Sequence, residues 1–74
     1  MTVRITQEYD RKYNAVLMED DGSIINNTRS DVPINVSYGR LRVLLRINFH
    51  INIPTLSGIN FKKKGYKRIA ELNV

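Results

Sequence analysis

The residues best suited to chemistry in this sequence form a basic cluster near its carboxyl end. Five basic residues and one tyrosine lie within seven positions: Lys62, Lys63, Lys64, Tyr66, Lys67 and Arg68. Ammonium and guanidinium groups neutralise phosphates and release their counterions, and a tyrosine ring can stack on an unpaired base. Lysines at a hairpin tip can also serve only to keep a sheet edge from aggregating. The cluster therefore indicates either contact with nucleic acid or a solvated turn.

Three arginines upstream of this cluster favour the first interpretation. In an extended chain, one face would carry six polar residues: Arg40, Arg42, Arg46, Asn48, His50 and Asn52. No acidic residue lies between positions 32 and 70, whereas solvated strand faces usually pair opposite charges. In a helix, Arg42 and Arg46 would still share a face because they are four residues apart. Both arrangements favour binding of a polyanion.

The net charge is divided unevenly along the chain. Residues 1–37 contain four basic and six acidic residues, a net charge of −2. Residues 38–74 contain eight basic residues and one acidic residue, a net charge of +7, and the two halves together give the total of +5. A segment with this charge attracts polyanions over a distance, so the charge bears on the partner rather than on the fold.

The other candidates for chemistry are weaker. His50 is the only histidine and no carboxylate lies near it in sequence, so we interpret it as a polar surface residue or a minor phosphate contact. Glu19, Asp20 and Asp21 could suggest a metal site, but directly before Gly22 they are typical of a hairpin turn. The chain contains no cysteine. We therefore expect no enzymatic activity, no metal and no cofactor.

The hydrophobic pattern predicts the elements that position these residues. Every second residue from Leu41 to Ile53 is apolar, as in a half-buried strand. A strand over residues 40–53 would have fourteen residues, more than the usual 3–10 or so. Alternatively, Ser37 caps a short helix through about Arg46, and a strand follows over residues 47–53. We predict a strand over the second half, and over the first half a strand with this helix as the alternative.

Two glycines predict hairpins. Each hairpin consists of a strand, a turn and a second strand: residues 13–18, 19–23 and 24–28 in the first, and residues 59–61, 62–66 and 67–72 in the second. Gly22 and Gly65 would each take the left-handed position of a three-residue loop with a bulge. Pro33 and Pro54 punctuate the chain between the hairpins, because proline interrupts a strand ladder.

These elements predict a mainly β fold. We expect one small domain over residues 1–74, built as a twisted sheet or barrel of about five to seven short strands with at most one short helix. The alternative is an α+β fold with a helix near residues 37–47. Phe49 and Phe61 fall on apolar faces and are predicted in the core. The core of a 74-residue chain is modest, so we also expect stabilisation by a homodimer or another partner.

Sequence features also suggest where the protein acts. No segment approaches the roughly 18 consecutive apolar residues of a membrane span. The first six residues alternate between polar and apolar and do not form the apolar core of a signal peptide. We expect a cytoplasmic protein with no membrane contact. The frequent isoleucine and asparagine fit an AT-rich coding sequence, such as that of a phage or mobile element, in which case the cytoplasm is that of the host.

The sequence thus predicts a small basic nucleic-acid-binding protein, a regulatory or accessory factor of phage or mobile-element type. It would hold the phosphates of DNA or RNA through the basic hairpin and the arginine row. The scarcity of aromatic residues favours a duplex or a structured RNA over an extended single strand. The alternatives are a protein-binding module that inhibits or adapts a host enzyme, and a self-associating structural component.

Overall fold

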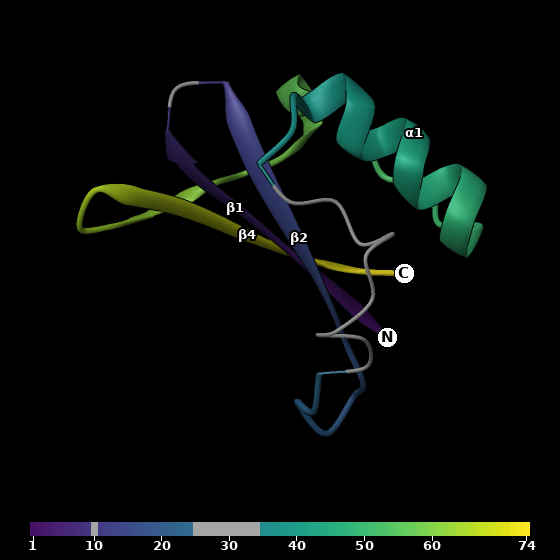
Figure 1. The fold of residues 1–74 in the computed structure, drawn as a ribbon. Helices are drawn as coiled ribbons and strands as arrows, with labels where there is room; N and C mark the ends of the chain where they lie inside the picture. The colour runs from purple at the N-terminus through teal and green to yellow at the C-terminus, as the bar shows by residue number, and fades with distance from the viewer. Residues whose placement is uncertain (10, 25–34) are drawn as a thin grey trace.

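The computed structural model describes residues 1–9, 11–24 and 35–74, and within them it contains one open antiparallel sheet with a helix against one face (Figure 1). In chain order the elements are β1 (Thr2–Tyr9), β2 (Lys12–Met18), α1 (Tyr38–Phe49), the short 3-10 helix η1 (Leu56–Gly58), β3 (Lys62–Lys64) and β4 (Lys67–Asn73). The strand order across the sheet is β2-β1-β4-β3. No helix in these residues is long and apolar enough to cross a membrane.

Strand β1 occupies the middle of the sheet and pairs with both β2 and β4. Its residues Val3 and Ile5 are fully buried, while the alternate residue Arg4 is exposed on the opposite face. Val3 lies between Leu17 of β2 and Leu72 of β4. Because side chains alternate along a strand, this register fixes one face of the sheet as the core.

Helix α1 covers that apolar face. The Ser37 side chain accepts a hydrogen bond from the backbone N–H of Arg40 and caps the first turn, as N-cap serines commonly do. Leu41 and Leu45 are fully buried against the sheet. The helix ends at His50, whose left-handed backbone (φ 56°) directs its N–H to the Arg46 carbonyl at 3.1 Å.

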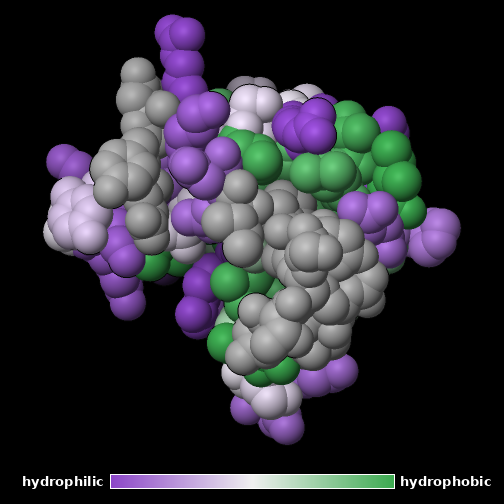
Figure 2. All heavy atoms as spheres, in the orientation of Figure 1, coloured by the Kyte–Doolittle hydropathy of each residue, from purple (hydrophilic) through white to green (hydrophobic). Residues whose placement is uncertain are grey.

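The strand predicted over residues 40–53 is therefore wrong, and the helix alternative beginning at Ser37 is confirmed. The helix continues to Phe49, and residues 50–55 form no strand. An alternating pattern also contains every fourth residue, and residues four apart share a helix face. Leu41 and Leu45 are accordingly buried, whereas Val43 and Ile47 are exposed, and hydrophobic surface gathers over α1 (Figure 2).

The second hairpin is confirmed, but its strand boundaries differ from the prediction, and the predicted three-residue loop with a bulge is wrong. Lys64 pairs with Lys67, so the loop contains only Gly65 and Tyr66, and the first strand is formed by the three lysines rather than by residues 59–61. Gly65 has a φ of 64°, as a type II′ turn requires at its first central position. The lysines therefore belong to a strand and alternate between its faces.

The first predicted hairpin is described only up to its turn. Gly22 has the expected left-handed φ of 91°, and Met18 forms an isolated bridge with Ile24. The remainder of the predicted strand over residues 24–28, and Pro33, lie outside the described residues.

The predicted fold class is confirmed in its coarser form. The described sheet is open and has four strands, so the mainly β composition is correct and the α+β alternative fits, whereas a barrel and five to seven strands are not found in this part of the chain. Phe49 and Phe61 are half-buried and pack against the core.

The two glycines with contrasting backbones give a test of this fold. At Gly65 the positive φ disfavours any side chain, so Gly65→Ala should destabilise the protein by about 1–2 kcal/mol. Gly39 lies in α1, and a Cβ there would meet nothing within 4 Å. Gly39→Ala should instead stabilise by up to about 1 kcal/mol. Urea denaturation of both variants measures the two signs, and a stabilising Gly65→Ala would contradict the turn.

Candidate nucleic-acid interface

The pairing of β3 with β4 divides the basic cluster between the two faces of the sheet. Lys62 is paired with Ile69 and Lys64 with Lys67, at positions that alternate with the buried Ala70. Lys62 and Lys64 therefore lie on the open face, away from α1. Lys63 is paired with Arg68 and lies on the face that carries the helix.

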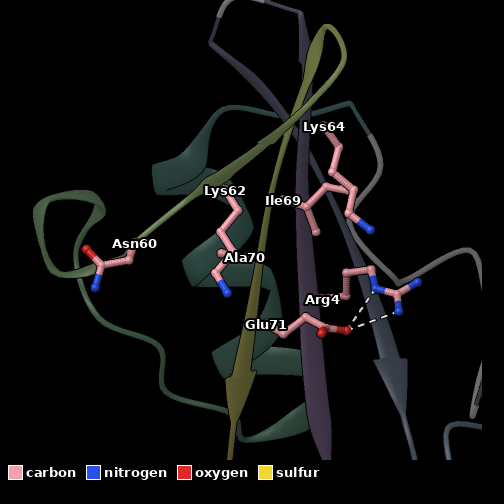
Figure 3. Close-up of a pocket in the computed structure, with 7 residues that line it drawn as sticks. All are labelled: Arg4, Asn60, Lys62, Lys64, Ile69, Ala70 and Glu71. Carbon is pink, nitrogen blue, oxygen red and sulfur yellow. Dashed lines mark hydrogen bonds and ion pairs between the residues drawn. The ribbon is translucent and has the colours of Figure 1, made fainter.

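The open face contains a shallow hollow of about 440 Å³. The residues around it come from β1, β3, β4 and the segment before β3: Arg4, Asn60, Lys62, Lys64, Ile69, Ala70 and Glu71 (Figure 3). Positive side chains stand on its two sides, and the half-buried Ile69 contributes apolar surface. A hollow of this shape and charge suits an anionic group attached to a larger molecule.

One ion pair sets the charge of the hollow. The Nε and Nη2 atoms of Arg4 each lie 3.0 Å from Oε2 of Glu71, and the two residues are neighbours across β1 and β4. This pair neutralises the one carboxylate of the hollow. No ion pair is found for Lys62 or Lys64 within the described residues, so these two ammonium groups supply the net positive charge.

The turn beside the hollow presents an aromatic ring. The Tyr66 side chain is 77% exposed, and Nζ of Lys67 lies 5.8 Å from the centre of its ring, within the range of a cation–π contact. On the opposite face, the Arg68 guanidinium lies 5.7 Å from the centre of the Phe61 ring. Of the predicted cluster, Lys62, Lys64 and the turn thus lie at or beside the hollow, whereas Lys63 and Arg68 lie on the face that carries the helix.

The predicted arginine row does not join this site. Helix α1 packs against the other face of the sheet. Arg42 and Arg46, one helical turn apart, line a second, smaller hollow of about 70 Å³ with Asn52 and others. The two hollows share no residue. Arg40 lies two residues before Arg42 and so points to a different side of α1. The single polar face expected from an extended chain is absent.

His50 and the acidic turn have structural roles. His50 is exposed and ends α1 through its backbone. Oδ1 of Asp21 accepts hydrogen bonds from the Ser23 backbone N–H at 2.9 Å and from the Ser23 hydroxyl at 2.7 Å, and the Asp20 carboxylate pairs with the amino group of Met1 at 2.9 Å. The turn role predicted for these acids is confirmed. In the described ranges, no three histidine, cysteine, aspartate or glutamate residues are grouped so that they could hold a metal ion.

Sequence reasoning missed five residues of the hollow: Arg4, Asn60, Ile69, Ala70 and Glu71. Arg4 stands in an alternating segment whose strand character could have been read from the first six residues. Its partner Glu71 could not have been found in this way, because their contact depends on the pairing of β1 with β4.

Comparisons with known proteins do not assign this site. No family model, no curated protein and no solved structure matches the chain.

The Asp21 turn predicts a pH dependence of stability. The hydrogen bond from the Ser23 backbone, followed by that from its hydroxyl, lowers the pKa of Asp21. A group with a lowered folded-state pKa stabilises the fold above its unfolded pKa and loses this effect as the pH falls through the folded-state value. The wild type should be more stable than Asp21→Asn at about pH 7, and the difference should shrink below about pH 4. Urea midpoints at both pH values measure it, and a constant difference would contradict it.

Proposed function

We propose that this protein binds nucleic acid through the open face of its sheet, with Lys62 and Lys64 as the principal phosphate contacts. The observation that carries this proposal is the placement of two lysines without carboxylate partners on the uncovered face, beside a hollow in which the one carboxylate is already paired with Arg4. Phosphates are the anions that such a pair of extended, flexible ammonium groups suits best.

The spacing of the lysines supports contact with one nucleic-acid backbone. Alternate residues of a strand lie about 7 Å apart, so the ammonium groups of Lys62 and Lys64 can reach two phosphates of the same strand. The hollow is also lined by the polar side chain of Asn60, which lies on the far side of Lys62 from Arg4, and by the apolar Ile69 (Figure 3). The sugar and the base edges next to a bound phosphate would lie over these two residues.

The proposed ligand is a duplex or a folded RNA. Binders of extended single strands stack successive bases on several aromatic rings, and among the described side chains Tyr66 is the one highly exposed ring. A single ring at a hairpin tip can contact one unpaired or terminal base. Because lysine contacts supply binding and bring no reactive group to the ligand, we propose a regulatory or accessory role.

Removal of the two open-face lysines should weaken binding. Fluorescence anisotropy with labelled duplex DNA, hairpin RNA and single-stranded DNA should be measured from about 50 to 300 mM salt. Lys62→Gln with Lys64→Gln should reduce affinity about tenfold or more, and the slope of log K against log salt should fall by about 2, because two phosphate contacts are lost.

The same hairpin provides a matched control. Lys63→Gln with Arg68→Gln removes the same charge from the opposite face, and it should change the affinity and the salt slope much less. Equal losses in the two double variants would show attraction by net charge without a site. Absence of binding to all three ligands at about 50 mM salt would overturn the proposal.

Tyr66 distinguishes stacking from phosphate contact. Tyr66→Ala should weaken binding to hairpin RNA with an unpaired loop by about 1–3 kcal/mol, and it should leave binding to blunt duplex DNA nearly unchanged. Tyr66→Phe keeps the ring and should restore binding to the RNA. Equal loss for both ligands in the Tyr66→Ala variant would assign the ring a different role.

A further inference from the structure

The outward face of α1 carries a row of residues that the fold leaves uncovered. Gly39, Val43 and Ile47 are spaced four residues apart and lie on one side of the helix; we refer to them as the helix row. Val43 is 41% exposed and Ile47 is 64% exposed, and Gly39 is also exposed. Hydrophobic spheres accordingly gather over α1, with hydrophilic spheres at their margins (Figure 2).

The helix row does not serve the stability of α1. A Cβ at Gly39 would meet nothing within 4 Å, and its φ is not in the left-handed region, so alanine would fit and would favour the helix more. Val43 and Ile47 are β-branched, which also makes them weaker helix formers than leucine or alanine. Three residues that weaken a helix, gathered on one uncovered row, indicate a surface kept for contact with another molecule.

Arginines flank the helix row on both sides. Arg40 lies on one side of it and Arg46 on the other, with Arg42 next to Arg46. Nε of Arg42 donates a hydrogen bond to the Ile53 carbonyl at 3.2 Å, which holds this guanidinium at the rim of the small hollow beside the row. Helix α1 contains no acidic residue, and no ion pair of these arginines is found in the part of the chain that the structure describes.

We propose that the helix row binds an acidic amphipathic helix of a partner protein. Residues four apart form a ridge that packs into the groove of a second helix, and Gly39 lets the partner backbone approach closely at one end. The row extends over about 12 Å, since its ends are eight helical steps apart and each step rises about 1.5 Å. Two turns of a partner helix would cover it, with apolar residues on Val43 and Ile47 and carboxylates toward the arginines.

Charge complementarity decides between this partner and two others. A second copy of α1 would bring three arginines against three arginines with no carboxylate in either helix. A nucleic acid would satisfy the arginines but would cover Val43 and Ile47 with charged phosphates. An acidic amphipathic helix satisfies both. The proposal does not depend on nucleic-acid binding, because Lys62 and Lys64 lie on the other face of the sheet.

The test is an NMR titration of the full ¹⁵N-labelled chain with synthetic helical peptides. One peptide carries leucine at positions i, i+4 and i+8 with glutamate on both sides, and a matched peptide carries lysine in place of glutamate. The acidic peptide should shift the amide signals of Gly39, Val43 and Ile47, with a dissociation constant at least tenfold lower than that of the lysine peptide. Ile47→Asp should weaken acidic-peptide binding at least tenfold, whereas Lys62→Gln with Lys64→Gln should leave it unchanged.

Three results would overturn the proposal. The first is that the acidic peptide causes no shifts in α1, or that the shifts persist in the Ile47→Asp variant. Because position 47 is exposed, this variant should fold, and circular dichroism can check that it does. The second is self-association of the protein without peptide, removed by Ile47→Asp, which would assign the row to a second copy. The third is a shift of the same signals by duplex DNA, which would assign the row to nucleic acid.

Discussion

The pairing of β1 with strands on both of its sides is the constraint on which the rest of the structure depends. Val3 and Ile5 have no exposed surface, and they lie between apolar residues of β2 and β4. With this face committed to the core, α1 must cover it, and the other face remains open. The same alternation that buries Val3 and Ile5 places Arg4 against Glu71 on the open face. The location of the candidate interface is therefore a consequence of core packing at the centre of the sheet.

The local chemistry of the sequence was sufficient to predict turns and caps, but it was not sufficient to choose between strand and helix for residues 40–53. Gly22, Gly65 and Ser37 have the conformations that their types favour. The apolar alternation from Leu41 onward was ambiguous, because residues four apart share one face in a helix and also share one face in a strand. Tertiary packing resolves the ambiguity: the sheet buries Leu41 and Leu45, whereas Val43 and Ile47 on the other side of the helix stay exposed.

The candidate interface was predictable only in part for a related reason. The basic cluster was visible in the sequence, yet its division between the two faces of the sheet depends on the position of β3. This strand begins at Lys62, whereas the predicted strand ended at residue 61. If residues 62–66 were a loop, as predicted, all charges of the cluster could contact the same partner. As a strand paired with β4, the cluster sends Lys62 and Lys64 to one side and Lys63 to the other. The contribution of Arg4 depends on a pairing between distant segments, which a single sequence does not reveal.

That distant pairing also has a consequence for how the chain folds. Thr2 is the partner of Asn73, and Gln7 is the partner of Arg68, so a large part of the sheet joins segments separated by some sixty to seventy residues. Contacts of such long sequence separation close large loops and slow folding. During synthesis, β1 and β2 can pair long before β4 emerges from the ribosome. Until then one edge of β1 is unpaired, and a nascent chain in that state is prone to edge-to-edge association with its neighbours.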